Sequence, residues 1–250
     1  MAKATRELVR GLSGCIVSDQ IAVTGKPIGR MTHDPSTQPE DSGWTFFSNA
    51  ESTAYLADHS NFSVWHLNDV ANHDPAIVPL LCALPGARYE RDRKSGGFVE
   101  APDSKPDPRR SKLPRGITVV TGDHAMAPAW LLRLPVPYRR RIEDGSVVLW
   151  RHGVTVWTHT VDDAPRTRAN RVAELRKAIS PKATELRITD DGRVVRIAYR
   201  LTEEASDGRQ PALYGFVVAD TGYIRLGIYF DRETDAPEAY AILESCTRRS

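Results

Sequence analysis

The sequence predicts an α+β protein of two small domains, each with a largely antiparallel sheet and helices packed on it. Alternating apolar residues in Val154–Thr160 predict a strand, and short apolar runs next to turn sequences, such as Leu213–Val218, predict others. Apolar residues at helical spacing occur in only a few stretches between them. Four prolines fall within residues 101–116, which predicts an extended linker. The predicted domains are therefore residues 1–100 and 117–250.

In the first domain, the helical pattern over Leu67–Leu84 is interrupted at Asp74-Pro75. Proline suits the first position of a helix, and Asn72 or Asp74 suits the cap before it, so a second helix is expected to begin there. One or two helical turns are expected at Glu51–Asp58. The expected strands are Cys15–Ser18, Ile21–Val23, Ile28–Met31, Trp44–Phe47, Phe62–His66 and Ala87–Arg91.

In the second domain, the order of elements predicts an antiparallel sheet with helices on one face. Thr189–Gly192 and Ala219–Gly222 have the composition of tight hairpin turns. The basic run Arg139–Arg141 is interpreted as a solvated turn. The expected strands are Ser146–Leu149, Val154–Thr160, Glu185–Ile188, Arg193–Leu201, Leu213–Val218 and Tyr223–Phe230, and the expected helices are Pro165–Ile179 and Thr234–Thr247.

Composition argues against several classes of partner. The net charge of the 250-residue chain is +2, so no strong field favours nucleic acid or an anionic membrane. No apolar run approaches the ~18–20 residues of a membrane span. Residues 1–100 carry three more acidic than basic side chains, which hints at a basic partner. Three cysteines without a close-spaced cluster indicate a reducing, cytoplasmic location rather than a disulfide framework.

No catalytic motif stands out, and no catalytic, metal or cofactor site is predicted. His59, His66 and His73 are spaced by seven residues, whereas zinc sites usually contain tighter pairs, so solvated or capping histidines are expected. Cys15 could form a nucleophile system with His33 or His66 and with Asp19 or Asp74. Its apolar neighbours instead predict a small buried hydrophobe.

Aspartates and aromatic residues of the first domain are the remaining candidates. Asp41, Asp69 and Asp74 could pair as carboxylates, but aspartates before turns and helices more often act as caps. Alternation places Trp44 and a second aromatic, Phe46, on one side of a strand and Phe47 on the other. At least one of these rings is therefore expected to stay exposed for a partner.

The first domain contains a series of short motifs over about Gly14–Gly86, namely Gly14–Asp19, Gly29 before Met31, Asp41–Trp44 with Phe47, Leu67-Asn68, Asp74-Pro75 and Pro85-Gly86. With these motifs the domain resembles a known bacterial family. The family is the thirty-third catalogued immunity-protein family, formerly a domain of unknown function. The resemblance implies an α+β domain without established enzymatic activity, from polymorphic toxin systems in which a small cytoplasmic protein blocks a cognate toxin. The second domain is similar to uncharacterised bacterial domains.

The resulting hypothesis is a cytoplasmic immunity protein that neutralises a cognate protein toxin by stoichiometric binding. The predicted contacts are Asp41, Trp44, Asp69 and Asp74, with the loop Asp34–Gly43. Two alternatives stay open. One is a small metal-dependent hydrolase that uses histidines and aspartates of the first domain. The other is an adaptor module of a secretion system.

Overall fold

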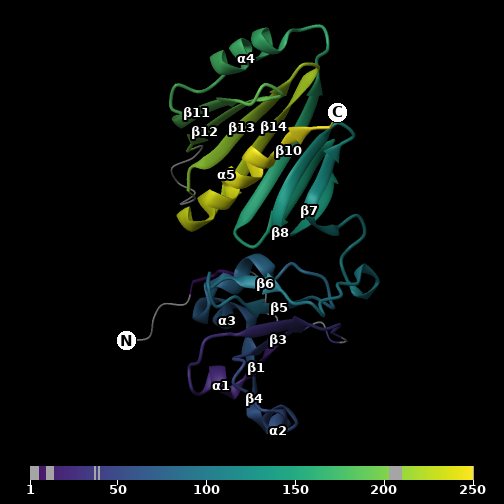
Figure 1. The fold of residues 1–250 in the computed structure, drawn as a ribbon, viewed down its shortest axis with the longest axis vertical. Helices are drawn as coiled ribbons and strands as arrows, with labels where there is room; N and C mark the ends of the chain where they lie inside the picture. The colour runs from purple at the N-terminus through teal and green to yellow at the C-terminus, as the bar shows by residue number, and fades with distance from the viewer. Residues whose placement is uncertain (1–5, 10–13, 37, 39, 203–209, 250) are drawn as a thin grey trace. The chain divides into compact units, whose positions relative to one another are not determined.

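A computed structural model describes residues 6–9, 14–36, 38, 40–202 and 210–249 of the chain (Figure 1). Two positions of the predicted contact loop, Thr37 and Pro39, lie outside the described residues. The chain divides into two compact units, Met1–Pro114 and Arg115–Ser250. Each unit contains one sheet and a few helices, which confirms the predicted α+β class with two sheet bodies. No helix among the described residues is long and apolar enough to cross a membrane.

The sheet of the first unit has six strands in the order β4-β1-β3-β2-β5-β6. Neighbouring strands are antiparallel except β1 and β3, which are parallel, so the sheet is mixed. The strands are β1 (Gly14–Ser18), β2 (Arg30–His33), β3 (Asp41–Phe47), β4 (Phe62–His66), β5 (Arg88–Arg91) and β6 (Phe98–Glu100).

The helices of the first unit are short, and one replaces a predicted strand. The predicted strand Ile21–Val23 is wrong, because the Ser18 hydroxyl accepts a hydrogen bond from the Gln20 N–H at 3.3 Å and caps a helical turn. The predicted break at Asp74-Pro75 is confirmed, with the Asp74 carboxylate capping the second helix. The helices are α1 (Asp19–Ala22), α2 (Thr53–Leu56), η1 (His59–Asn61), α3 (Leu67–His73), η2 (Pro75–Leu80) and η3 (Pro108–Arg110).

Strand alternation divides the first sheet into a core face and an open face. The core face contributes buried side chains from β1, β2, β3 and β5, and α3 and η2 supply further buried apolar residues. The proline-rich segment begins against this unit, since the Lys105 N–H donates to the Gly86 carbonyl at 2.9 Å. The buried apolar side chains of the sheet are Cys15, Val17, Met31, Trp44, Phe46 and Tyr89.

The second unit is built on a nine-stranded antiparallel sheet in the order β11-β12-β13-β14-β10-β9-β8-β15, with β7 also paired to β8. The two predicted hairpins, β11–β12 and β13–β14, are confirmed. The strands are β7 (Thr118–Ala127), β8 (Trp130–Glu143), β9 (Ser146–Arg151), β10 (Val154–Asp162), β11 (Thr184–Asp190), β12 (Val195–Leu201), β13 (Ala212–Ala219), β14 (Gly222–Phe230) and β15 (Thr247–Arg248), and the helices are α4 (Arg168–Lys177), η5 (Glu233–Asp235) and α5 (Ala236–Ser245).

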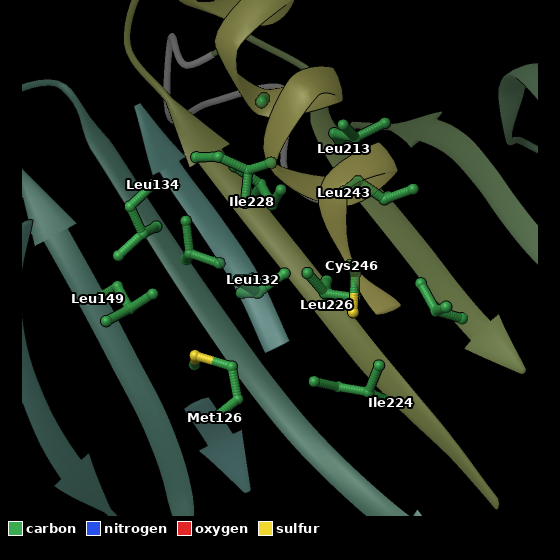
Figure 2. Packing of buried hydrophobic residues seen from close by; sticks show 14 of the residues in the cluster. Met126, Leu132, Leu134, Leu149, Leu213, Ile224, Leu226, Ile228, Leu243 and Cys246 are labelled. Carbon is green, nitrogen blue, oxygen red and sulfur yellow. The ribbon is translucent and has the colours of Figure 1, made fainter. Parts of the chain in front are cut away.

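Two expectations for the second unit are wrong. Arg139–Arg141 is not a turn, because these residues lie in β8 and pair with β9. The helices also do not share one face. Figure 2 shows Leu243 of α5, and Cys246 directly after the helix, against Leu226 and neighbouring side chains of the sheet. The side chains of α4 pack instead on the other face of the sheet, against a cluster that includes Phe216.

Candidate partner-binding surface

Trp44 lies in the core of the first unit. Its side chain is 2% exposed, and its ring stacks on His33 with 4.6 Å between ring centroids. His33 is held by two carbonyls, with Nδ1 2.9 Å from the Ala83 oxygen and Nε2 3.1 Å from the Ser42 oxygen. Burial lowers the pKa of His33. The structure therefore gives Trp44 a packing role and leaves its side chain no surface for a partner.

Asp41 closes the turn that leads into Trp44. Its carboxylate accepts a hydrogen bond from the Gly43 N–H at 2.8 Å, and the adjacent Ser42 hydroxyl donates to the Gly14 carbonyl at 2.7 Å. Gly43 has a φ of 77°, and a Cβ there would lie 2.1 Å from the Asp34 carbonyl oxygen. The sequence Asp41–Trp44 thus fixes the start of β3 against β1.

Asp41 and Asp69 both act on the buried thiol of Cys15. The Cys15 Sγ donates to the Trp65 carbonyl at 3.4 Å, and burial together with the two carboxylates raises its pKa to about 12. The thiol therefore stays protonated at neutral pH, which does not suit a nucleophile. Asp69 is exposed and lines a hollow of about 380 Å³ with Gly14, Val64, Trp65 and His66.

Asp74 already has partners inside the first unit. Its carboxylate forms an ion pair with Arg91 and accepts a hydrogen bond from the Ala76 N–H at 3.3 Å. The Asp74 side chain is only 15% exposed. Asp74 thus joins the start of η2 to β5, and it has a structural role of its own.

The three evenly spaced histidines lie in different surroundings. His59 and His66 line two different hollows, whereas His73 Nε2 lies 3.2 Å from the Lys26 carbonyl oxygen. Within the part of the chain that the structure describes, no three His, Cys, Asp or Glu side chains gather in a metal-binding group.

The open face of the first sheet carries a larger, mostly apolar hollow. Strand register places Ile16 opposite Val64 and Thr45, and places Arg30 opposite Phe47, so these side chains share one face. Val64 is 79% exposed and Ile16 is 43% exposed. The hollow measures about 500 Å³ and is lined by Ile16, Arg30, Thr45, Phe47, Leu56, His59, Phe62, Ser63 and Val64. An exposed apolar patch with polar neighbours is typical of an interaction site.

Residues 15–101 match the family model described as the Immunity protein Imm33 domain. The first unit carries an Imm33 domain. No curated protein and no solved structure matches the chain. The Imm33 domain implies a toxin-neutralising immunity protein whose partner is a cognate toxin. The rest of the chain has no family assignment.

All side chains around the larger hollow belong to the Imm33 domain. Alternation along Phe62–His66 puts Phe62, Val64 and His66 on one side of that strand, and alternation along Trp44–Phe47 lets Phe47 face away from Trp44. Arg30 was missed, because an arginine in a four-residue strand has no pattern that distinguishes a surface role from a binding role. Strand register was needed to bring Arg30 next to Phe47.

Proposed function

We propose that this chain neutralises a cognate toxin by stoichiometric binding in the cytoplasm, without catalysis and without a cofactor. The observation that carries the proposal is the apolar hollow on the open sheet face of the Imm33 domain. Such a surface gains free energy when a protein partner covers it, at roughly 25 cal/mol for each Å² of apolar area removed from water.

The chemistry of the first unit supports binding rather than turnover. The Cys15 thiol is buried and its pKa is raised, and Asp74 is engaged by Arg91. His33 is held between two backbone carbonyls in the core. These groups hold the domain together, whereas the open sheet face offers a surface with room for a partner.

The test is a titration of the toxin encoded beside this gene with the purified full-length chain. We expect toxin activity to reach zero at one molar equivalent and a complex of defined mass in size-exclusion chromatography with light scattering. Inhibition by a small fraction of an equivalent, with toxin chemically altered, would instead identify an enzyme. The absence of both a complex and inhibition would contradict the immunity proposal.

A further inference from the structure

We propose that the open face of the Imm33 domain receives a carboxylate of the toxin on Arg30, with an apolar toxin side chain beside it in the hollow. The inference rests on the proposed function, because the occupant is the toxin. It goes further in naming the chemistry of the contact: an aspartate or glutamate of the toxin that is flanked by an apolar residue.

Arg30 is held in place by an aromatic ring, and it has no ionic partner among the described residues. Its guanidinium carbon lies 4.5 Å from the centroid of the Phe47 ring. Among the residues that the structure describes, no carboxylate lies within ion-pair distance of Arg30, although Glu90 is directly opposite it on β5. The Nε atom of Arg30 is buried without a hydrogen-bond partner in the same part of the chain.

The two arginines of β5, the strand next to Arg30, show what an arginine with an ionic partner looks like in this sheet. Arg91 forms an ion pair with Asp74, and Arg88 lies 3.6 Å from a carboxylate oxygen of Asp103. Arg30 differs from both, because its charge is compensated by a ring face alone. A guanidinium presents a planar fork of donors that matches a carboxylate with two parallel hydrogen bonds.

The hollow around this guanidinium is lined by aromatic, aliphatic and polar side chains. Phe47 and Phe62 pack edge to face with 6.1 Å between their centroids, and Ile16 and Val64 extend the apolar surface. Thr45, Ser63 and His59 supply polar groups around it. Arginine and aromatic side chains in a partly enclosed apolar site have the composition of binding hot spots. An acidic residue next to an apolar one therefore fits both parts of the site.

Local and long-range charge have different effects here. The acidic excess of residues 1–100 attracts a basic toxin surface at a distance and raises the association rate. Arg30 acts only at contact, where a desolvated charge pair fixes the register of two surfaces and slows dissociation. A basic toxin with one acidic contact residue satisfies both conditions.

The experiment measures the affinity of full-length variants for the purified toxin encoded beside this gene, by calorimetry at physiological ionic strength. Arg30→Glu is expected to weaken binding by at least about thirtyfold, since it places like charges in a desolvated contact. Arg30→Lys should lose less affinity than Arg30→Glu, because an ammonium group keeps the positive charge but lacks the paired donors of the guanidinium. Val64→Glu is expected to weaken binding through the apolar part of the site.

Matched controls use residues of the same types outside the hollow. Val23 is 76% exposed, close to the exposure of Val64, and Arg93 is exposed in the turn before β6. Val23→Glu and Arg93→Glu should leave the affinity within about threefold, as expected for rim or distant positions. Circular dichroism and thermal melts confirm that each variant is folded. Replacing the matching toxin carboxylate with lysine should restore binding to Arg30→Glu.

The outcomes separate this inference from the proposed function. If the wild-type chain neutralises the toxin and the folded Arg30→Glu and Val64→Glu variants bind equally well, the Arg30 contact is wrong and the immunity function stands. If these variants instead abolish a dimer of this chain and leave toxin binding unchanged, the face is a self-association surface. If the wild-type chain does not bind the toxin, the proposed function itself fails.

Discussion

Asp41 and Trp44 lie three residues apart, yet one faces solvent and the other is enclosed by the core. The sequence predicted the turn correctly, since Asp41 accepts a hydrogen bond from Gly43. It could not predict which aromatic side chain stays accessible. Alternation separates Trp44 from Phe47 but does not state which side the helices cover. Only the buried residues of α3 and η2 decide that Trp44 faces inward.

Substituting Trp44→Ala should destabilise the protein by about 3–5 kcal/mol, because it leaves a large cavity beside His33 and Tyr89. Urea unfolding followed by circular dichroism measures this loss. Trp157→Ala is the matched control, since Trp157 is 37% exposed, and its effect should be much smaller. Toxin affinity of the folded Trp44→Ala fraction should be unchanged. A large specific loss of affinity would give Trp44 a direct contact after all.

His152 makes the second unit sensitive to acid. Burial and the charges of Arg139 and Arg151 lower its pKa to about 4 from 6.5. The unfolded state therefore binds more protons between these values, and stability should fall as pH drops through 6.5 and level off below 4. The loss is up to about 3 kcal/mol, at roughly 1.4 kcal/mol for each pKa unit.

The variant His152→Gln should flatten this dependence. Urea unfolding at pH 7.5 and at pH 4.5 gives the loss of stability in each protein, and the difference between wild type and variant isolates His152 from His33 and His124, whose pKa values are also lowered. An identical pH dependence in both proteins would mean that His152 does not carry the effect.

Among the elements, the hairpins were predictable, and the two longest strands were not. Turn sequences with glycine and alternating apolar residues identify β11–β12 and β13–β14 directly. In contrast, β8 contains Pro135, Pro137 and the basic run Arg139–Arg141, each of which argues against a strand in isolation. β8 is a strand because it pairs with β7 on one side and with β9 on the other, and these pairings cannot be read from its own residues.

Asp74 and Asp69 lie near the junction of α3 and η2, and alanine substitutions at the two positions should have different effects on stability. Asp74→Ala removes the cap of η2 and the ion pair with Arg91, so a loss of about 1–2 kcal/mol is expected. Asp69→Ala removes an exposed carboxylate and should change stability by less than about 0.5 kcal/mol. Chemical denaturation of both variants measures the difference. Equal losses would contradict the structural role assigned to Asp74.

The contact between α5 and β13 depends on Gly215. A Cβ at this position would lie 2.0 Å from Cδ1 of Leu243, so Gly215→Ala should cost about 1–3 kcal/mol through overpacking. Leu243→Ala alone should cost about 2–5 kcal/mol. The double variant should lose clearly less than the two single losses combined, because the clash is gone. Gly97→Ala, which meets only Ser95 Oγ at 3.6 Å, is the control. If the two losses of stability simply add in the double variant, the cost of Gly215→Ala does not come from a clash with Leu243.

At the scale of the whole molecule, the reactivity of the three cysteines can be used to measure how often each of the two cores opens. Cys15 and Cys82 are buried in the first unit, and Cys246 is buried in the second. Burial raises the pKa of Cys15 and Cys246 to about 12. The native protein should therefore react very slowly with a disulfide reagent, since the thiolate is the reactive form.

Three thiols should titrate rapidly only after denaturation. The variant Cys246→Ala confines the signal to the first unit, and Cys15→Ala with Cys82→Ala confines it to the second. The rate of labelling then measures the opening of each core separately. Rapid, stoichiometric reaction of any thiol in the native protein would contradict the burial of that residue.

The pairing of β15 with β8 sets the order in which the molecule is completed during synthesis. Thr247 and Arg248 pair with Leu131 and Trp130, more than a hundred residues earlier in the chain. The sheet of the second unit thus stays incomplete until these late residues have emerged from the ribosome. The Imm33 domain contains all its strands within the first unit, and N-terminal domains generally fold first. A nascent chain would thus carry a finished first sheet, with its Arg30 face already formed, before translation of the same polypeptide ends.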